Sequence, residues 1–367
     1  MKAIKRFKVI IWLTLATIGF RAFFYLLFAN EIVLSPDQIA MSVHGRHFAS
    51  GNYYGVLSTY WTPLYPILLG IFTLFTKSVV QSAIIISFIA SCLVVLLTYY
   101  LVKQSFGQRV AVIAAILAIF LPHFINAMFA VGTENLYLLW ITGALILGWR
   151  GFRTDSVKDY FFVGILLGLA YLTRPEAFGY LALFALAIFS KRLLQKKFPL
   201  GWIPSKQILA LLIGFSLLAA PYILYLKKET GAWTISGKIQ ANTIVGDFEA
   251  SENSVSPENG EAEKFSFRSF MKYFALNLIR IQKSISYLVP SFLFILIGLG
   301  LFAGRWNKRR FLREMYLILF CLLTVLGYAA AVVQDRYFYI LLPVFLGWIA
   351  YGVLHLERWF QKSIQKS

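Results

Sequence analysis

The sequence has 367 residues, of which 59% are hydrophobic and only 14% are charged, and its mean hydropathy is +0.71. A soluble domain normally carries about a quarter charged residues. The composition therefore excludes a soluble or disordered chain, although the formal charge of +19 is high. Both cysteines fall within apolar runs, which suggests neither a disulfide nor a thiolate metal site.

Apolar runs of about 20 residues recur along the chain, and each is long enough to cross a hydrocarbon core of about 30 Å. Because only helices and closed barrels satisfy their backbone in lipid, and no barrel-strand alternation is present, these runs predict an all-α polytopic membrane protein. The clearest runs are Val9–Ala29, Val79–Leu101, Val110–Ala130, Ile208–Leu226, Tyr287–Ala303, Met315–Val333 and Tyr337–His355.

Two weaker regions bring the expected number of spanning helices to about ten. Leu136–Trp149 becomes long enough if it starts near Gly132. Phe161–Ser190 contains Thr173-Arg174-Pro175-Glu176 at its middle, where a proline and two charges disfavour one continuous helix. We therefore expect two short helices that meet at a polar turn. Pro63–Thr76 is interpreted as an outer interfacial or re-entrant helix.

The charges predict the orientation. With the N-terminus inside, the inner segments hold 22 basic residues and only three acids, as the positive-inside rule requires. These segments are 1–8, 102–109, 150–159, 190–207, 304–313 and 356–367. The basic residues flank apolar runs, so no nucleic-acid partner is expected, whereas contact with membrane lipids is. We expect one transmembrane domain over 1–367 in the plasma (inner) membrane of a bacterium, with both termini cytoplasmic.

Two outer segments are long enough to carry function, the first outer loop at 30–77 and the second at 227–286. The first has a helical stretch from Asp37 to Ser50 followed by a glycine-rich turn. In the second, the acidic stretch Gly246–Glu263 predicts a flexible loop. Phe270–Tyr287 alternates apolar and basic residues, which predicts an amphipathic helix lying on the membrane.

Four polar turns fall at helix ends on the outer face: Asp37, Glu134-Asn135, Arg174-Pro175-Glu176 and Asp335-Arg336. Carboxylates can act as general bases or metal ligands, and arginines can bind a phosphate in a bidentate fork. A cavity with these groups would suit a transfer reaction whose donor is a lipid phosphate.

Each candidate also has a structural interpretation. Asp37 could be a first-turn acid of its helix, Glu134 a cap, and Arg174–Glu176 or Asp335–Arg336 an ion pair. His44 and His47 have the spacing of a metal pair, but no third ligand is near, so a hydrated surface pair is favoured. Arg21, deep in the first span, could extend towards the interface or point into the cavity.

Several pieces of the sequence occur in a recognisable order. They are Arg21, Asp37-Gln38-Ile39-Ala40-Met41-Ser42, Thr62-Pro63-Leu64-Tyr65-Pro66, Thr133-Glu134-Asn135-Leu136, Thr173-Arg174-Pro175-Glu176 and Asp335-Arg336-Tyr337. This order resembles the GT-C glycosyltransferases, in particular the protein mannosyltransferase and aminoarabinose-transferase-like group that uses polyprenyl-phosphate sugars. The resemblance implies a GT-C-like bundle of about ten transmembrane helices with outer juxtamembrane helices.

The resemblance also implies an activity and roles. The enzyme would transfer a sugar from a polyprenyl-phosphate donor to a lipid, glycan or protein acceptor with inversion, and Asp37 would be the catalytic base. Arg336 and Arg174 would bind the donor phosphate, while Glu134, Glu176 and Asp335 would orient the acceptor or a cation. Many relatives carry a second acid where this chain has Gln38, which leaves the metal requirement unknown and a divalent cation as the one candidate cofactor.

Non-glycosyl functions remain as alternatives. A lipid-linked polymer polymerase would use a similar donor. A transporter or flippase should show repeated halves or charges at mid-membrane, and this sequence shows neither. A non-catalytic membrane component would tolerate the loss of Asp37.

Overall fold

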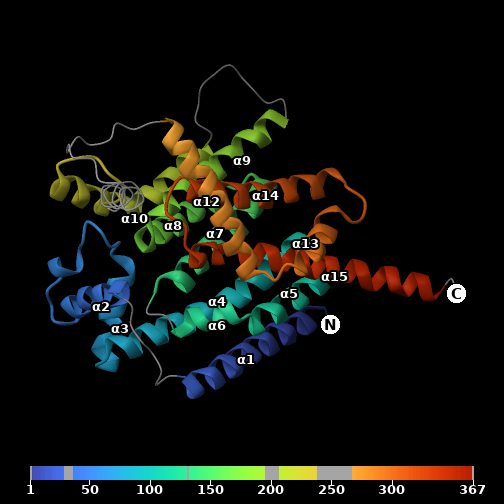
Figure 1. Ribbon diagram of the computed structural model, residues 1–367, viewed down its shortest axis with the longest axis horizontal. Helices are drawn as coiled ribbons and strands as arrows, with labels where there is room; N and C mark the ends of the chain where they lie inside the picture. The colour runs from blue at the N-terminus through green and yellow to red at the C-terminus, as the bar shows by residue number, and fades with distance from the viewer. Residues whose placement is uncertain (1, 29–35, 130–131, 195–205, 238–266, 366–367) are drawn as a thin grey trace, which may run out of the picture.

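A computed structural model describes residues 2–28, 36–129, 132–194, 206–237 and 267–365. Every regular element in these ranges is helical, which confirms the predicted all-α class (Figure 1). The acidic stretch Gly246–Glu263 lies outside the described residues.

The N-terminal part of the fold combines long helices with several short ones. Its elements are α1 (Lys2–Phe28), α2 (Pro36–Ala49), η1 (Tyr54–Val56), α3 (Leu64–Thr76), α4 (Val79–Phe106), α5 (Gln108–Phe120), α6 (Pro122–Phe129) and α7 (Glu134–Thr154). The predicted helix after Asp37 is confirmed, and it ends before a turn in which Gly51 adopts a positive φ of 83°.

The C-terminal part contains the remaining elements. They are α8 (Val157–Thr173), η2 (Pro175–Gly179), α9 (Tyr180–Leu194), α10 (Lys206–Thr230), α12 (Phe267–Leu288), α13 (Leu293–Phe302), α14 (Lys308–Ala329), η3 (Asp335–Leu341) and α15 (Leu342–Ile364). The two short helices expected within Phe161–Ser190 are present as α8 and α9, and they meet at η2 because Pro175 cannot continue α8.

By length and composition, five helices in the described part of the chain could cross a membrane, or seven if each of two bent pairs is one span. The polytopic membrane class is therefore confirmed, whereas about ten spans had been expected. Three helices account for the difference. With 17 and 15 residues, α8 and α9 are short, and α7 carries ionisable residues near both ends.

Three expected elements differ in the structure. The run Val110–Ala130 is divided into α5 and α6, which bend by 48° at Pro122. The expected span Tyr287–Ala303 begins at the end of α12 and contains α13, whose ten residues extend about 15 Å and cross a membrane only together with α12. Pro290 separates α13 from α12, and the two helices differ in direction by 99°. Within Pro63–Thr76, α3 is a short apolar helix of 13 residues, fewer than a span needs, and its interfacial or re-entrant placement stays a prediction.

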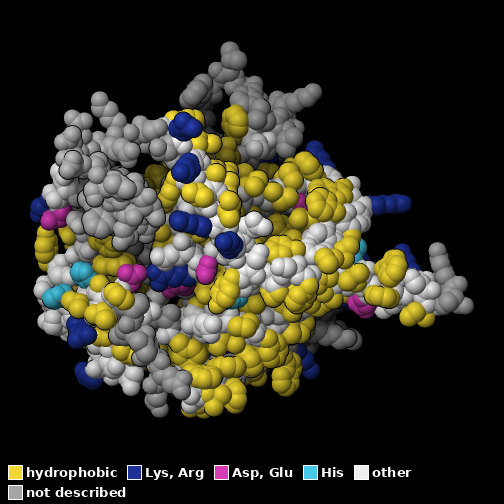
Figure 2. All heavy atoms as spheres, in the orientation of Figure 1, with side chains coloured by type: hydrophobic (Ala, Val, Ile, Leu, Met, Phe, Trp, Pro, Cys, Tyr) yellow, Lys and Arg dark blue, Asp and Glu magenta, His cyan; other side chains and the backbone are white. Residues whose placement is uncertain are grey.

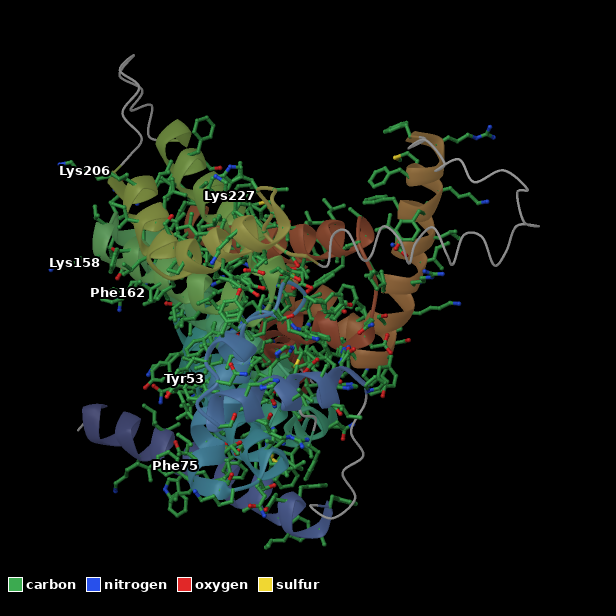
Figure 3. All side chains as sticks on the ribbon, turned by 90° about the vertical axis from the view of Figure 1, so that its left-hand side faces the viewer. Tyr53, Phe75, Lys158, Phe162, Lys206 and Lys227 are labelled. Carbon is green, nitrogen blue, oxygen red and sulfur yellow. The ribbon has the colours of Figure 1, made fainter. Side chains whose placement is uncertain are left out.

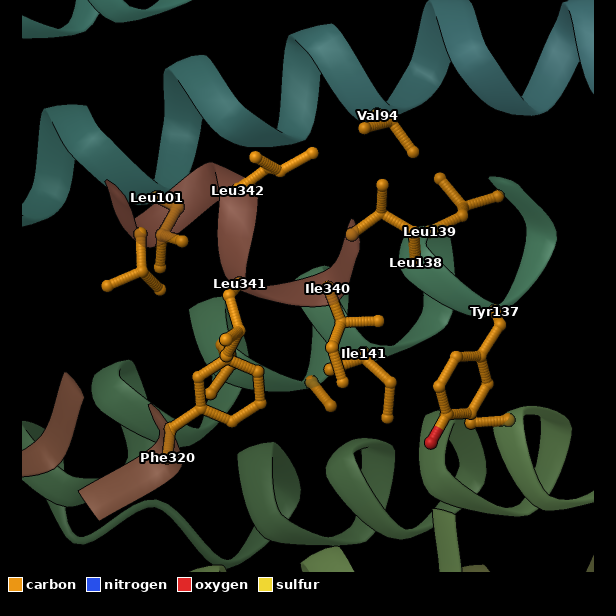
Figure 4. Packing of buried hydrophobic residues seen from close by; sticks show 14 of the residues in the cluster. Val94, Leu101, Tyr137, Leu138, Leu139, Ile141, Phe320, Ile340, Leu341 and Leu342 are labelled. Atoms are coloured by element: carbon orange, nitrogen blue, oxygen red, sulfur yellow. The ribbon is translucent and has the colours of Figure 1, made fainter. Parts of the chain in front are cut away.

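The core is formed where η3 and the start of α15 enter the bundle. Ile340, Leu341 and Leu342 are at most 2% exposed and lie between α4 and α7 (Figure 4). Apolar side chains cover much of the surface in the region of α1, as expected where lipid surrounds a helix (Figure 2).

The helix ends divide the molecule into two faces. The N- and C-termini lie on one side, whereas α2, α3 and η1 lie on the other (Figure 1). We call the second side the site face, because η2, η3 and the first turn of α7 also converge there. On this face α12 runs across the direction of α15 (Figure 1).

Candidate active site

One cavity at the site face brings together five of the six predicted site residues. It is lined by Asp37, Glu134, Arg174, Glu176 and Arg336, which come from four elements and the residue before η2. Its volume of about 40 Å³ holds a few water molecules, so a sugar must bind at its open side.

Asp37 lies in the first turn of α2, where the helix dipole favours a negative charge. Its side chain is 45% exposed, and Oδ2 accepts a hydrogen bond from Nη2 of Arg336 at 3.0 Å. The carboxylate is therefore accessible from the open side of the cavity and paired on its inner side.

Glu134 and Arg174 form the buried ion pair of the site. Glu134 begins α7 and its side chain is 4% exposed, while Oε1 accepts a hydrogen bond from Nη2 of Arg174 at 2.9 Å. Arg174 also donates from Nε to the Thr133 hydroxyl at 2.7 Å, and its guanidinium lies over the ring of Tyr337. Burial alone lowers the pKa of Arg174, but Glu134 and Glu176 outweigh burial and raise this pKa above the usual arginine value.

Arg336 connects the two carboxylates. Besides its contact with Asp37, its Nη1 lies 3.5 Å from Oε1 of Glu134, and its Nε donates to Gln334 at 2.8 Å. Its side chain is 32% exposed, compared with 11% for Arg174. Of the two arginines, Arg336 is therefore the one that an incoming anion can reach.

The other two predicted acids differ in position. Glu176 lines the cavity from η2, and its Oε2 is buried without a hydrogen-bond partner in the described residues. Asp335 does not line the cavity. Its Oδ1 accepts a hydrogen bond from the hydroxyl of Ser284 on α12 at 2.5 Å, so this side chain connects η3 to α12.

Three residues at the site had been given no role from the sequence, although two of them belong to the quoted motifs. Thr133 holds Arg174, and Tyr337 lies beneath both arginines, 4.9 Å from Arg174 and 5.9 Å from Arg336. Trp61 lines the cavity next to Thr62, whose hydroxyl bonds the carbonyl of Thr173 at 2.7 Å. In the sequence these residues were marked only by lying next to ionisable residues. Such a position does not show whether a side chain contacts the site.

Three further candidates do not line the cavity. Arg21 is fully buried and donates to the carbonyl of Ala118 at 3.3 Å, so it neither reaches the interface nor points into the site. Nδ1 of His44 lies 2.9 Å from the carbonyl oxygen of Gly55, and His47 lies near Asn52. Among the described residues, no three His, Cys, Asp or Glu side chains form a group that could hold a metal ion.

Residues 61–225 match the family model for dolichyl-phosphate-mannose-protein mannosyltransferase. This segment contains Glu134, Arg174 and Glu176, whereas Asp37 and Arg336 lie outside it. No curated protein matches the chain in sequence.

Solved structures share the fold. ArnT from Cupriavidus metallidurans bound to undecaprenyl phosphate has a TM-score of 0.60 and 15% identity, over 93% of this chain and 59% of that chain. The Archaeoglobus fulgidus oligosaccharyltransferase with Zn and sulfate has a TM-score of 0.52 and 18% identity, over 95% and 49%. AglB from the same organism, in complex with an inhibitory peptide and a dolichol-phosphate, has a TM-score of 0.52 and 16% identity, over 99% and 52%.

The chain thus spans about half to three-fifths of the length of these structures. The resemblance to the GT-C group is confirmed by the family model over residues 61–225 and by a shared fold over nearly the whole chain. The chain is therefore a polytopic α-helical membrane protein with the GT-C glycosyltransferase fold.

Proposed function

We propose that this protein is a membrane glycosyltransferase that moves a sugar from a polyprenyl-phosphate donor to an acceptor hydroxyl or amine, with inversion. The observation that carries the proposal is the sharing of Arg336 between the half-exposed Asp37 and the buried Glu134 in one cavity. ArnT and AglB share this fold, and their structures contain undecaprenyl phosphate and a dolichol-phosphate, respectively. These bound lipids support a lipid-phosphate donor.

The reaction is a single displacement at the anomeric carbon. Asp37 takes the proton from the acceptor as its oxygen or nitrogen forms the new bond to that carbon. The bond between the anomeric carbon and the phosphate oxygen breaks, and both electrons leave with the polyprenyl phosphate. Asp37 is the only carboxylate of the described cavity whose side chain is about half exposed, which suits contact with an acceptor.

Arg336 binds the leaving phosphate. Because the Arg336–Asp37 pair is partly exposed, solvent screens it, and exchange for a phosphate costs little. A guanidinium that moves from Asp37 to the phosphate stabilises the charge that develops there and leaves the carboxylate free to accept a proton. Binding of the donor phosphate thus releases the Asp37 carboxylate from Arg336, so that it can act as the base.

Arg174 contributes to phosphate binding indirectly. Two of its donors are already engaged by Glu134 and Thr133, so its main role is to hold Glu134 in position against Arg336. Glu134 then orients Arg336, and Glu176 adds negative charge beside Arg174. Asp335 acts on the turn that carries Arg336 rather than on a substrate.

A divalent cation fits the charge of the site in part. The cavity holds three carboxylates and two guanidinium groups, a formal charge of −1, and a phosphate donor adds to it. The buried Oε2 atoms of Glu134 and Glu176 have no hydrogen-bond partner in the described residues and could contribute two ligands. Two such oxygens do not make a complete Mg²⁺ or Mn²⁺ shell, so donor phosphate and water would supply the others.

The site face is proposed to be extracytoplasmic, since the opposite ends of the spans carry most of the basic residues. The termini are then cytoplasmic, and the membrane is the plasma membrane of a bacterium. The whole chain acts as one domain, with acceptor contacts from the first outer loop (30–77) and the second (227–286).

The test is transfer by the purified protein in lipid nanodiscs. Polyprenyl-phosphate sugars with a labelled sugar are presented one by one together with extracted glycolipids, glycans and peptides. We expect one donor to pass label to an acceptor and to release polyprenyl phosphate. Movement of an intact donor across the bilayer without bond cleavage would instead identify a flippase, and elongation of a lipid-linked chain would identify a polymerase.

A further inference from the structure

The helix α12 carries a basic face that the reaction does not use. Arg268, Lys272, Arg280 and Lys283 are all exposed and fall within about 120° of arc on this helix. The helix has no acidic residue, and none of the four side chains forms an ion pair with a described residue. Figure 2 shows dark-blue side chains in a row over α12, and Figure 3 shows nitrogen-tipped side chains that point away from the bundle.

The opposite side of α12 forms hydrogen bonds with neighbouring segments of the protein. Asn277 is 0% exposed and donates to the carbonyls of Ala329 and Ala331, at 3.1 and 2.8 Å, where α14 ends. Ser284, 5% exposed, donates to Asp335 at 2.5 Å. Asp335 directly precedes Arg336, so α12 is connected by hydrogen bonds to the turn that carries Arg336.

The direction of α12 differs by 99° from that of α13, which packs on α15, a helix long and apolar enough to cross a membrane. A helix that runs across the direction of a spanning helix lies along the membrane surface. Between its basic residues lie exposed apolar ones, Leu276, Ile279 and Tyr287, with 48%, 54% and 61% exposure. Apolar and cationic side chains on the same exposed surface favour the boundary between acyl chains and phosphates.

We propose that the basic face of α12 binds the phosphates of anionic phospholipids at the site face, and that the bound lipid fixes the turn at Asp335–Arg336 through Ser284. The charge of the face favours this partner, because four cations that form no ion pair with a described residue match the phosphates of a lipid surface. The inference concerns lipid binding and the position of the turn, so it holds whether or not the transfer reaction is the one proposed.

The experiment measures lipid binding and backbone protection, not activity. The full chain is placed in nanodiscs of phosphatidylcholine with or without phosphatidylglycerol, and retained lipid is counted by native mass spectrometry after release. The test variant replaces the four basic residues of α12 by glutamine. A control variant removes the same charge from exposed residues elsewhere at the site face: Arg46, Lys77, Lys227 and Lys228.

We expect the wild type and the control to retain phosphatidylglycerol in preference to phosphatidylcholine. In the α12 variant this preference should fall by at least about tenfold. Equal loss in both variants, or no preference in the wild type, would overturn the lipid site. The absence of a preference in the wild type would be the result expected if the acidic stretch Gly246–Glu263 were the partner of this face.

Hydrogen exchange of residues 334–341 tests the connection to the turn. With phosphatidylglycerol, their amides should exchange several-fold more slowly in the wild type than in the α12 variant. Ser284→Ala should keep the lipid preference but lose this protection. Protection that is unchanged in Ser284→Ala would refute the role of Ser284, and protection that is independent of phosphatidylglycerol would refute the coupling.

Discussion

Nη2 of Arg336 lies 3.0 Å from Oδ2 of Asp37, although 299 positions separate the two residues in the sequence. The contact joins the first turn of α2 to the first turn of η3 across the mouth of the cavity. Because Glu134 shares the same guanidinium, a change in Arg336 alters the surroundings of two carboxylates at once.

Arg336→Ala should reduce transfer by about 10²–10³-fold, because one preorganised donor to the developing phosphate charge is lost. Arg336→Lys should recover little of this, since a lysine cannot form the fork that reaches Asp37, Glu134 and a phosphate. The measurement is kcat and KM for the donor. Full activity of Arg336→Lys would contradict phosphate binding by the guanidinium.

Asp37→Asn should reduce kcat by about 10²–10⁴-fold and leave donor binding nearly unchanged, because the amide keeps its size but cannot accept the proton. The matched control is Glu357→Gln, which removes one exposed acid near the C-terminal end of α15, away from the site face. Transfer should persist in the control. If Asp37→Asn transfers sugar at the wild-type rate, Asp37 is not the base.

Arg174→Ala should destabilise the protein more than Arg336→Ala, by about 3 kcal/mol or more, because it leaves the buried Glu134 carboxylate without its main partner. Arg336 is a third exposed, and its loss should cost at most about 1 kcal/mol. Thermal unfolding in detergent compares the two variants. Adding Glu134→Gln to Arg174→Ala should restore part of the loss, and strict additivity would show that the two side chains are not coupled.

Part of this site could be predicted from the sequence, since polar residues beside proline mark helix ends in an apolar chain. The break at Arg174–Pro175 followed from such a signal, and the start expected near Gly132 lies two residues before the start of α7 at Glu134. Arg174 and Glu134 both line the cavity. The position of Asp335 could not be predicted. Its direction depends on Ser284, which lies on a separate helix and carries no distinguishing pattern.

The number of spans was harder to predict because hydropathy records apolar character and not direction. The run from Tyr287 has the composition of a span, yet Pro290 separates α12 from the ten-residue α13, and the two helices differ in direction by 99°. The placement of Arg21 was equally open. Its contact with the carbonyl of Ala118 depends on the packing of α1 against α5, which the sequence of α1 does not encode.

The close packing of α8 on α10 gives a last prediction, which tests the fold rather than the chemistry. A Cβ added at Gly214 would lie 2.2 Å from the carbonyl oxygen of Phe161, and one at Gly164 would lie 2.2 Å from that of Leu211. Small residues at these positions let the two backbones approach, as in other membrane helix pairs. Gly214→Ala should therefore destabilise the protein by about 1–3 kcal/mol, since backbone atoms must move apart.

Gly298→Ala in α13 is the matched control, because a Cβ there meets no atom within 4 Å. Thermal unfolding in detergent should show a lower Tm for Gly214→Ala and an unchanged or slightly higher Tm for Gly298→Ala. Separation of α8 from α10 should also shift Tyr222, whose hydroxyl bonds the carbonyl of Ser58 at 2.8 Å near the cavity wall formed by Trp61. Equal Tm values for the two variants would mean that α8 and α10 are not in backbone contact.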